Sequence, residues 1–239
     1  MKVIRFIRRL WSCKWIFRSL LSTVYFNFHY FPWRQAVHLP VLLYKPRLLR
    51  CRGKVKLDVD VVRMGMVILG KDTVSLYPNS GLVWECDGEV VFTGICYIGN
   101  SSALSVSKTG HVVFGGGFHA SAALKLVSYY DIRFGDDVHI GWDCIVTDTD
   151  FHKLVSFWDA KSTKGYARVF IGKGNWLGMK CCVLKGTCTP AFCTVSAGSV
   201  LTGDYGYLPS YSVVGTNARV VLRKEGFYRD FDDDKIIYK

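Results

Sequence analysis

The first part of the chain lacks acidic residues altogether. The first acid is Asp58, whereas 13 of the 31 lysines and arginines come before it. The remaining 18 basic residues stand against 19 acids, so a basic head, residues 1–57, precedes a nearly neutral body. This asymmetry excludes a chain that is basic throughout. Binding to nucleic acid is not expected either, because bulky aliphatic residues separate the basic ones and no binding motif occurs.

Long apolar runs are also missing. A membrane-spanning helix needs roughly 20 consecutive apolar residues, and the uncharged run from Ser19 to Trp33 contains polar residues and a proline. Arg18 interrupts the apolar region and no small-residue cleavage site follows, so a secretory signal is not expected. The nine cysteines include no C-x-x-C pair, and most stand beside aliphatic residues. Reduced, buried thiols in a cytoplasmic protein without a metal site are therefore expected.

Residues 1–22 have the pattern of a basic amphipathic helix. Apolar side chains recur at three- and four-residue steps, and Lys2, Arg5 and Arg9 lie on the opposite side. Such a helix fits an anionic membrane surface, where its apolar face enters the headgroup layer and its cations meet lipid phosphates. It fits equally well a helix packed on its own domain or on a neighbouring subunit. Both alternatives stay open, and the first would bring the protein to the inner face of the membrane.

A six-residue period runs through the body. From Ile171 the chain divides into IGKGNW, LGMKCC, VLKGTC, TPAFCT, VSAGSV and LTGDYG, and the same frame opens earlier at Phe134, Ile140 and Val146. The first position is mostly aliphatic and the fifth mostly small. This period fits neither an α-helix nor a long amphipathic strand. It predicts a coil with three flat sides, whose stacked turns pair as parallel strands about 4.8 Å apart around an aliphatic interior.

This pattern resembles the hexapeptide-repeat acyltransferases, and among them the O-acetyltransferases of maltose, galactoside and bacterial surface polysaccharides. The resemblance implies an all-β fold, a left-handed parallel β-helix over residues 58–222. A short helical and aromatic extension over 1–57 would precede it, and a tail over 223–239 would follow. Residues 110–222 match well, whereas the segment before them follows the period less steadily. The resemblance also implies a homotrimer, because the family's donor groove lies between two subunits.

The frame breaks once within the well-matched region. After Val146 the next aliphatic residue on the frame is Ile171, much farther on than one hexad. The intervening residues predict an extruded loop over about 153–170. It begins in the segment DTDFH, which ends at His152.

Acyl transfer to a hydroxyl needs a base whose pKa lies near neutrality, which imidazole provides. By the resemblance, His152 is the general base, and the acceptor oxygen attacks the acetyl carbonyl directly, without an acyl-enzyme. Asp148 or Asp150 would orient the ring or hold the acceptor sugar. His119, in the segment FHAS, lies near a family acceptor-site strand and is a second candidate.

Two other interpretations of the break remain. Asp148, Asp150 and His152 alternate, so an extended backbone would put them on one face, as a metal site requires. A polar loop start with no chemical role is the simplest alternative.

For the donor, the resemblance places Trp176 and Gly178 near the thioester and Ala197 and Gly198 along the pantetheine arm. Arg219 would meet a phosphate of coenzyme A. Small residues matter in such a groove because a larger side chain would fill it. An exposed or interface aromatic would also explain Trp176, and ordinary corner packing would explain the small residues.

The sequence departs from the family at three places. Gly203 stands where the family usually has a lysine, and Thr189-Pro190 replaces the Ile-Gly that opens a family hexad. At the end of the repeat, residues 215–219 read GTNAR where the family has Gly-Asn-Pro-Ala-Lys, which is a further departure. The resemblance thus implies an acetyl-CoA-dependent O-acetyltransferase that acts on a sugar hydroxyl in surface polysaccharide synthesis. The alternatives are an N-acyltransferase for an amino sugar and a non-catalytic β-helix scaffold.

Overall fold

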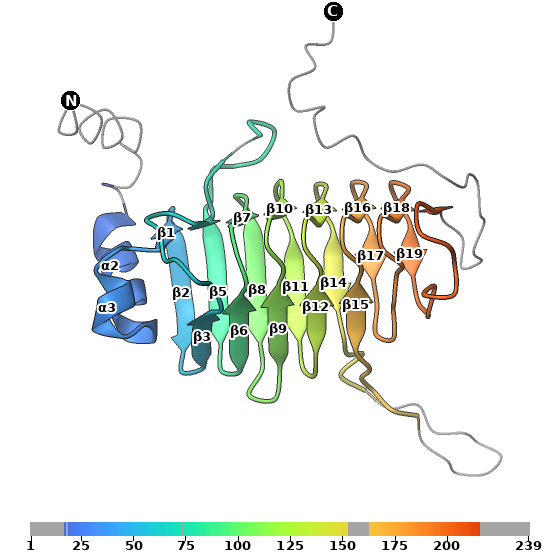
Figure 1. The fold of residues 1–239 in the computed structure, drawn as a ribbon, viewed down its shortest axis with the longest axis horizontal. Coiled ribbons are helices and arrows are strands. Elements are labelled where there is room, and N and C mark those ends of the chain that lie inside the picture. Colours follow the sequence, from blue (N-terminus) through green and yellow to red (C-terminus); the bar gives the residue numbers. More distant parts are fainter. Residues whose placement is uncertain (1–16, 18, 73, 153–162, 216–239) are drawn as a thin grey trace, which may run out of the picture.

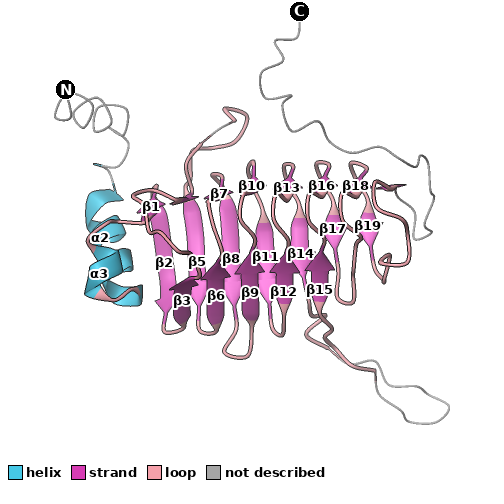
Figure 2. Ribbon diagram, viewed as in Figure 1, coloured by secondary structure: helices cyan, strands magenta, loops and turns pink. Residues whose placement is uncertain are grey.

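The computed structural model describes residues 17, 19–72, 74–152 and 163–215 of the 239-residue chain. Helices α2 (Leu20–Tyr30) and α3 (Trp33–Ala36) stand at one end of a long column of short strands (Figure 1). Figure 2 shows that the rest of the described chain consists of strands and the turns between them. Neither helix has the length and apolar character that crossing a bilayer requires.

Three parallel sheets form the flat sides of the column, and each coil as far as β15 contributes one strand to each sheet in turn. In the later coils the third side has only isolated bridges, at Cys188 and Asp204. Sheet A contains β1 (Val41–Leu43), β4 (Val67–Leu69), β7 (Cys96–Ile98), β10 (Phe118–Ala120), β13 (His139–Ile140), β16 (Trp176–Leu177), β18 (Thr194–Val195) and β20 (Val213–Val214). Sheet B contains β2 (Pro46–Cys51), β5 (Leu82–Cys86), β8 (Ser102–Val106), β11 (Lys125–Ser128), β14 (Ile145–Thr147), β17 (Cys182–Val183) and β19 (Val200–Leu201). Sheet C contains β3 (Lys54–Leu57), β6 (Glu89–Phe92), β9 (His111–Phe114), β12 (Ile132–Phe134) and β15 (Val169–Ile171).

The interior of the column is built from the first and fifth positions of each hexad. The first-position residues from 171 onward are all buried: Ile171, Leu177, Val183, Thr189, Val195 and Leu201. The small fifth-position residues are buried as well: Asn175, Cys181, Thr187, Cys193 and Ser199. Thr189 departs from the aliphatic pattern. Its hydroxyl donates a hydrogen bond to Asn175 Oδ1 at 2.7 Å and accepts one from Gly172 N at 3.0 Å. The hexad interpretation of the body is confirmed.

The amino-terminal coils are wider than the carboxy-terminal ones. Leu177 pairs with Val195, three hexads on, whereas Ile98 pairs with Ala120 across a longer coil. Strands β5 and β8 have five residues each and alternate buried and half-buried side chains. Because these strands are longer, the sides of the coils no longer repeat every six residues. The segment before residue 110 therefore follows the six-residue period poorly.

The β-helix begins at Val41, so the predicted boundary after residue 57 is wrong. Strands β1, β2 and β3 pair in parallel with β4, β5 and β6. Their basic residues project outward, as Lys54 and Lys56 do on either side of the buried Val55. A second excursion, over 70–81 between β4 and β5, was also not expected (Figure 1). The expected tail over 223–239 lies outside the described residues, as does most of the basic helix at 1–22.

Helix α2 closes the open edge of sheet A with polar side chains. Asn27 donates to Val41 O at 2.7 Å and accepts from Val41 N at 3.1 Å. Thr23 Oγ1 accepts from Leu43 N at 3.2 Å, and Ser19 Oγ from Lys45 N at 2.8 Å. Four helical residues rise about 6 Å, close to the span of two strand residues, so one helix face matches every second residue of the strand. The helix thereby satisfies backbone groups that an edge strand leaves unpaired.

Candidate active site

The extruded loop leaves the column after β14, at the corner between sheets B and C (Figure 1). Thr149 and Tyr166 form an antiparallel bridge at its base. Asp150 N donates to Gly165 O at 2.8 Å, and Ala167 N donates to Asp148 O at 3.0 Å. The loop therefore has a short two-stranded neck, while residues 153–162 beyond it lie outside the described part.

His152 lies at the outer end of this neck and is exposed. Phe151 before it has a φ of +60°, so the chain turns there instead of continuing as a strand. Gly165 faces the His152 backbone so closely that a Cβ at position 165 would come within 2.7 Å of the His152 carbonyl oxygen. A glycine is therefore required opposite the imidazole-bearing residue, and the structure presents the ring to solvent.

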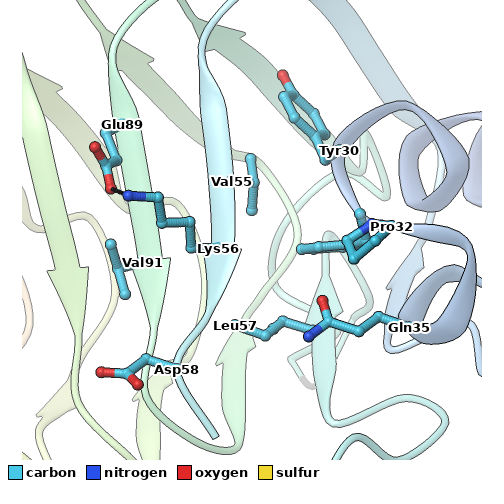
Figure 3. A pocket seen from close by; sticks show the side chains of 10 residues that line it. Tyr30, Pro32, Gln35, Val55, Lys56, Leu57, Asp58, Glu89 and Val91 are labelled. Atoms are coloured by element: carbon cyan, nitrogen blue, oxygen red, sulfur yellow. Dashed lines mark ion pairs between the residues drawn. The ribbon is translucent and has the colours of Figure 1, made fainter.

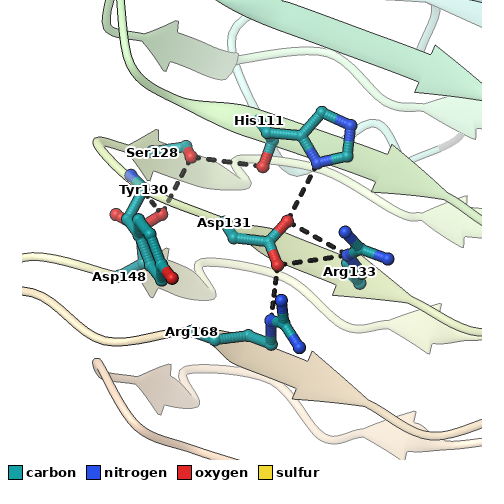
Figure 4. Close-up of polar contacts among 7 residues, drawn as sticks. All are labelled: His111, Ser128, Tyr130, Asp131, Arg133, Asp148 and Arg168. Atoms are coloured by element: carbon teal, nitrogen blue, oxygen red, sulfur yellow. Dashed lines mark hydrogen bonds and ion pairs between the residues drawn. The ribbon is translucent and has the colours of Figure 1, made fainter.

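Asp148 lies inside the column and away from the exposed His152, which argues against its predicted role as an acceptor-binding residue. Its side chain is completely buried. It accepts hydrogen bonds from Ser128 Oγ at 2.9 Å and Tyr130 N at 2.9 Å (Figure 4), and from Tyr129 N at 2.7 Å. The carboxylate holds the turn of the preceding coil and so fixes the start of the neck.

Asp150 is exposed and pairs with a lysine of the next coil. The distance from Lys185 Nζ to Asp150 Oδ2 is 2.9 Å, and the same ammonium donates to Lys164 O at 2.8 Å. Lys185 thus ties both sides of the neck to the column. Sequence analysis missed it, although it stands in the hexad VLKGTC at the equivalent corner one coil later.

The metal interpretation of the DTDFH segment fails on this geometry. Asp148 points into the column, whereas Asp150 and His152 lie outside it, so the three side chains do not share a face. Within the described ranges, no group of three or more histidine, cysteine, aspartate or glutamate side chains is placed to hold a metal ion.

Three tyrosines form an aromatic wall beside the neck. The ring centroids of Tyr130 and Tyr166 lie 5.1 Å apart, and those of Tyr129 and Tyr166 lie 5.5 Å apart. Tyr129 and Tyr130 are about two-fifths exposed, at 40% and 42%. These rings are available for contact with a ligand at the base of the neck, and sequence spacing alone did not bring them together.

A buried carboxylate next to this wall connects the amino-terminal ends of three neighbouring strands of sheet C, β9, β12 and β15. Asp131 accepts from His111 Nδ1 at 2.9 Å, from Arg133 Nε at 3.1 Å and from Arg168 Nε at 2.5 Å (Figure 4). Burial alone would raise the pKa of Asp131, but these hydrogen bonds outweigh it and hold the pKa below its usual value. The ionised Asp131 anchors Arg168, where the chain returns from the loop.

The predicted donor residues gather at a different corner, between sheets A and B. Trp176 is 43% exposed and, with Ser121, Gly141, Trp142 and Met179, lines a pocket of about 280 Å³. A Cβ at Gly178 would come within 2.6 Å of Ala197 N, and one at Gly141 within 2.7 Å of Met179 N. The two glycines therefore allow the backbones of successive coils to lie close together at this corner, beside the exposed indole of Trp176.

Ala197 and Gly198 lie on the open side of the same corner, and both are exposed. A Cβ at Gly198 would meet no atom within 4 Å, but its φ of +72° favours glycine for conformational reasons. Both residues are accessible to an elongated ligand. Arg219, the predicted phosphate contact, lies outside the described residues.

His119 is placed with Trp176 and not with His152. It lies on the outer face of sheet A, where its ring stacks on Tyr97 at 4.9 Å and lies 5.3 Å from His139. The strand register runs from His119 through His139 to Trp176. Sheet B separates this face from the loop neck, so one chain does not bring the donor corner and His152 together.

A larger hollow of about 520 Å³ lies at the other end of the molecule, between helix α3 and strand β3 (Figure 3). Lys56 and Glu89 form an ion pair of 2.6 Å in its wall, and Gln35 and Leu57 line it. None of the predicted site residues contributes to this hollow.

Comparisons with known proteins give one curated relative and several solved structures, and no family model matches the chain. The chain is 27% identical over 217 residues to the probable acetyltransferase Rv3034c of Mycobacterium tuberculosis (strain ATCC 25618 / H37Rv). The match covers 90% of this chain and 65% of that protein. The chain thus spans somewhat less than two thirds of its curated relative.

The structural likenesses are more distant. The polySia-specific acetyltransferase NeuO superposes with a TM-score of 0.49 at 17% identity, covering 82% of this chain and 84% of that one. The polysialic acid O-acetyltransferase OatWY gives 0.41 at 15% identity, covering 81% and 90%. A mutant of the N-acyltransferase AntD from Bacillus cereus, in complex with dTDP and coenzyme A, gives 0.34 at 15% identity, covering 77% and 81%. None of these scores reaches 0.5, so the site described above rests on this chain's own residues.

Three findings agree with the sequence prediction. The hexads occupy the interior positions that the repeat demands, the strands pair in parallel around three faces, and a curated probable acetyltransferase matches nine-tenths of the chain. The chain is therefore a parallel β-helix built from hexapeptide repeats, and it is similar to an acetyltransferase.

Proposed function

We propose that this protein transfers the acetyl group of acetyl-CoA to a hydroxyl of a sugar, in the synthesis of a surface polysaccharide. The observation that carries the proposal is the exposed imidazole of His152 on a braced neck, at the break in the repeat. A base on a rigid support is what direct acyl transfer requires, because the nucleophile must be deprotonated as it attacks.

The reaction balances with one base and no covalent enzyme intermediate. The acceptor oxygen attacks the thioester carbonyl carbon while the His152 imidazole takes the hydroxyl proton. The tetrahedral intermediate then collapses, the carbon–sulfur bond breaks, and the imidazolium returns the proton to the departing thiolate. The products are an O-acetyl ester and free coenzyme A.

The donor fits the corner that contains Trp176. The pantetheine arm is narrow and needs a shallow track with exposed backbone, which the glycines at 141 and 178 and the exposed Ala197 provide. The indole of Trp176 and the side chain of Met179 supply apolar surface beside it.

The acceptor fits the aromatic wall next to His152. Tyr129, Tyr130 and Tyr166 offer flat apolar faces with polar hydroxyl tips, which suits the apolar faces and hydroxyls of a sugar ring. Asp150, held by Lys185, is the nearest exposed carboxylate on the neck and can accept a sugar hydroxyl's hydrogen bond.

A partner protomer would complete the site. His152 and Trp176 belong to different corners of one chain, and a second copy in a homotrimer would set its donor corner against the first copy's neck. Mixing His152→Ala and Trp176→Ala chains tests this arrangement at an acetyl-CoA concentration well below the KM, because random assortment in mixed trimers regenerates an intact pair at about a quarter of the interfaces. Activity that does not recover on mixing would contradict the shared site.

The reaction itself is tested by incubating the chain with isotopically labelled acetyl-CoA and candidate saccharides, followed by mass spectrometry. An acetyl label that is released by mild base identifies an ester and supports the proposal. A label stable to base identifies an amide and an amino-sugar acceptor instead. Absence of both transfer and acetyl-CoA hydrolysis across the screen would favour a non-catalytic scaffold.

We place the reaction in the cytoplasm. The eight described cysteines are all free, and five of them are buried, as is typical of a reducing compartment. Fractionation of cells that produce the chain, with soluble and membrane fractions assayed separately, tests this placement.

A further inference from the structure

Helix α2 has an unusually polar inward face. Beside the buried Phe26, this face carries Ser19, Thr23 and Asn27, which bind backbone groups of the first coil. A helix at the end of a soluble solenoid normally packs apolar residues inward and presents a polar outer face, because the cap must keep the stack soluble. Here the polar positions are engaged on the inside, which leaves the other face to be explained.

The outward face of α2 is a continuous apolar stripe. Its residues recur at helical spacing and are all exposed: Phe17 (66%), Leu20 (39%), Leu21 (86%), Val24 (37%), Tyr25 (51%) and Phe28 (40%). Scattered exposed apolar residues are ordinary, but a stripe along a whole helix face marks an interaction surface.

Helix α3 and the turn after it extend the stripe. The ring centroids of Phe28 and Trp33 lie 5.2 Å apart, and Trp33 is 71% exposed. Val37 follows at 45% exposure. The apolar surface therefore covers the end of the column and is not confined to one helix.

The amino-terminal segment that forms this surface carries charges of a single sign, whereas the acids Asp58 and Glu89 line the hollow between α3 and β3, where Glu89 pairs with Lys56. Residues 1–57 contain 13 lysines and arginines and no acid, and Arg34 lies exposed on α3 itself. Two such surfaces brought face to face would repel each other, which disfavours a cap-to-cap dimer. An anionic surface is attracted by the charge and accepts the apolar side chains. Exposed tryptophan and tyrosine are typical of the boundary between acyl chains and headgroups.

We propose that the outer face of α2 and α3, which we call the cap face (residues 17–37), docks on a membrane that contains anionic lipids. The aromatic and aliphatic side chains enter the headgroup layer, and the basic residues meet the lipid phosphates. This location replaces the expectation for residues 1–22 alone, and it does not depend on the acyl-transfer proposal. The column would then stand on the membrane by its amino-terminal end.

Flotation of the full-length chain with lipid vesicles tests the proposal. The vesicles contain phosphatidylcholine alone, or with about one third of phosphatidylglycerol to provide negative charge. The variant combines Leu21→Glu with Trp33→Ala. Leu76→Glu serves as the matched control, because Leu76 is 72% exposed and lies on the excursion between β4 and β5. Unchanged melting temperatures would establish that all three chains are folded.

The wild-type chain and the Leu76→Glu control should float with the anionic vesicles. The double variant should float at least about fivefold less, since two large apolar contacts are lost. Wild-type chain that stays with the unbound protein, or that floats equally on neutral vesicles, would overturn the proposal. So would a double variant that floats like the wild type.

Two further measurements identify a different occupant of the cap face. Sedimentation velocity in which the double variant has a smaller mass than the wild type would assign the cap face to a second copy, against the proposal. A chain without residues 2–16 that no longer floats, while the double variant still does, would assign membrane binding to that segment alone.

Discussion

Gly165 lies against the backbone carbonyl of His152, and the pair defines the width of the loop neck. A Cβ at position 165 would meet the carbonyl oxygen and the carbonyl carbon of residue 152, at 2.7 and 3.2 Å. The first separation is one that real Cβ atoms essentially never show, so the backbone that carries the imidazole would have to shift.

Gly165→Ala should therefore lower kcat by at least about tenfold, because a displacement near 1 Å is costly in general-base catalysis. Gly203→Ala is the matched control, since a Cβ there would meet no atom within 4 Å. Steady-state kinetics with acetyl-CoA and an accepted saccharide provide the measurement. A Gly165→Ala enzyme of normal kcat would show that the neck does not position the base.

His152→Ala should lower turnover by at least about a hundredfold, the lower range for loss of a general base. The exposed His38 provides the control variant, His38→Ala, at the opposite end of the molecule. Release of free thiol from acetyl-CoA, followed with a chromogenic reagent, measures the rate. A near-native rate in His152→Ala would remove this residue from the mechanism.

Trp176→Ala should weaken donor binding more than turnover, because the indole borders the donor pocket and does not touch the reacting proton. We expect the KM for acetyl-CoA to rise about tenfold, equivalent to about 1.4 kcal/mol of binding free energy. Trp33→Ala, on the cap, should leave this KM unchanged. Calorimetric titration with coenzyme A checks the same quantity without catalysis, and equal affinities in both variants would contradict the donor assignment.

Asp148→Ala should act on stability. The substitution leaves one hydroxyl and two backbone N–H groups without their acceptor in a fully buried position. The free energy of unfolding should fall by about 2–3 kcal/mol. Asp150→Ala breaks only an exposed ion pair and should cost less than about 1 kcal/mol. Urea titrations of both variants give the two values, and similar losses would contradict the structural role of Asp148.

Because of Asp131, the free energy of unfolding should change with pH in the acid range. Its pKa in the folded protein is lower than that of an unfolded aspartate, near 3.9. The stabilisation is therefore fully present above the unfolded pKa and disappears as the pH falls through the lower folded value.

The advantage of the wild type over Asp131→Asn in the free energy of unfolding should accordingly be constant above about pH 5 and shrink below about pH 4. Asp60→Asn, at an exposed carboxylate, is the control for the change in charge. If the difference in the free energy of unfolding between the wild type and Asp131→Asn is the same at about pH 6 as at about pH 3, the assignment is contradicted.

The sequence predicted the column well where the coils have three hexads. Ile171, Leu177 and Val183 are buried as expected, because a strict period leaves only one set of positions that can face a common interior. The wider coils from β1 to β12 lack that strict period. Their pairing depends on strands such as β5 and β8, whose registers are set by neighbours far along the chain.

The candidate site was predictable only in part. The position of His152 followed from the break in the frame, which is a local signal. Lys185 and the tyrosines at 129 and 130 come from the coils after and before the break, and a linear pattern does not show which corners become stacked. The carboxylate of Asp148 turns inward to a neighbouring turn, which neither its place in the DTDFH segment nor its alternation with Asp150 and His152 reveals.

Parallel stacking also fixes the distance between the loop neck and the amino-terminal end of the column. The strand of sheet B that leads into the loop, β14, is separated from the first, β2, by β5, β8 and β11. At about 4.8 Å for each step, the neck stands about 19 Å along the axis from the first coil. Adding or removing one coil between them would move His152 by one such step and leave its chemistry intact. The number of coils therefore sets how far from the capped end an acceptor group is reached.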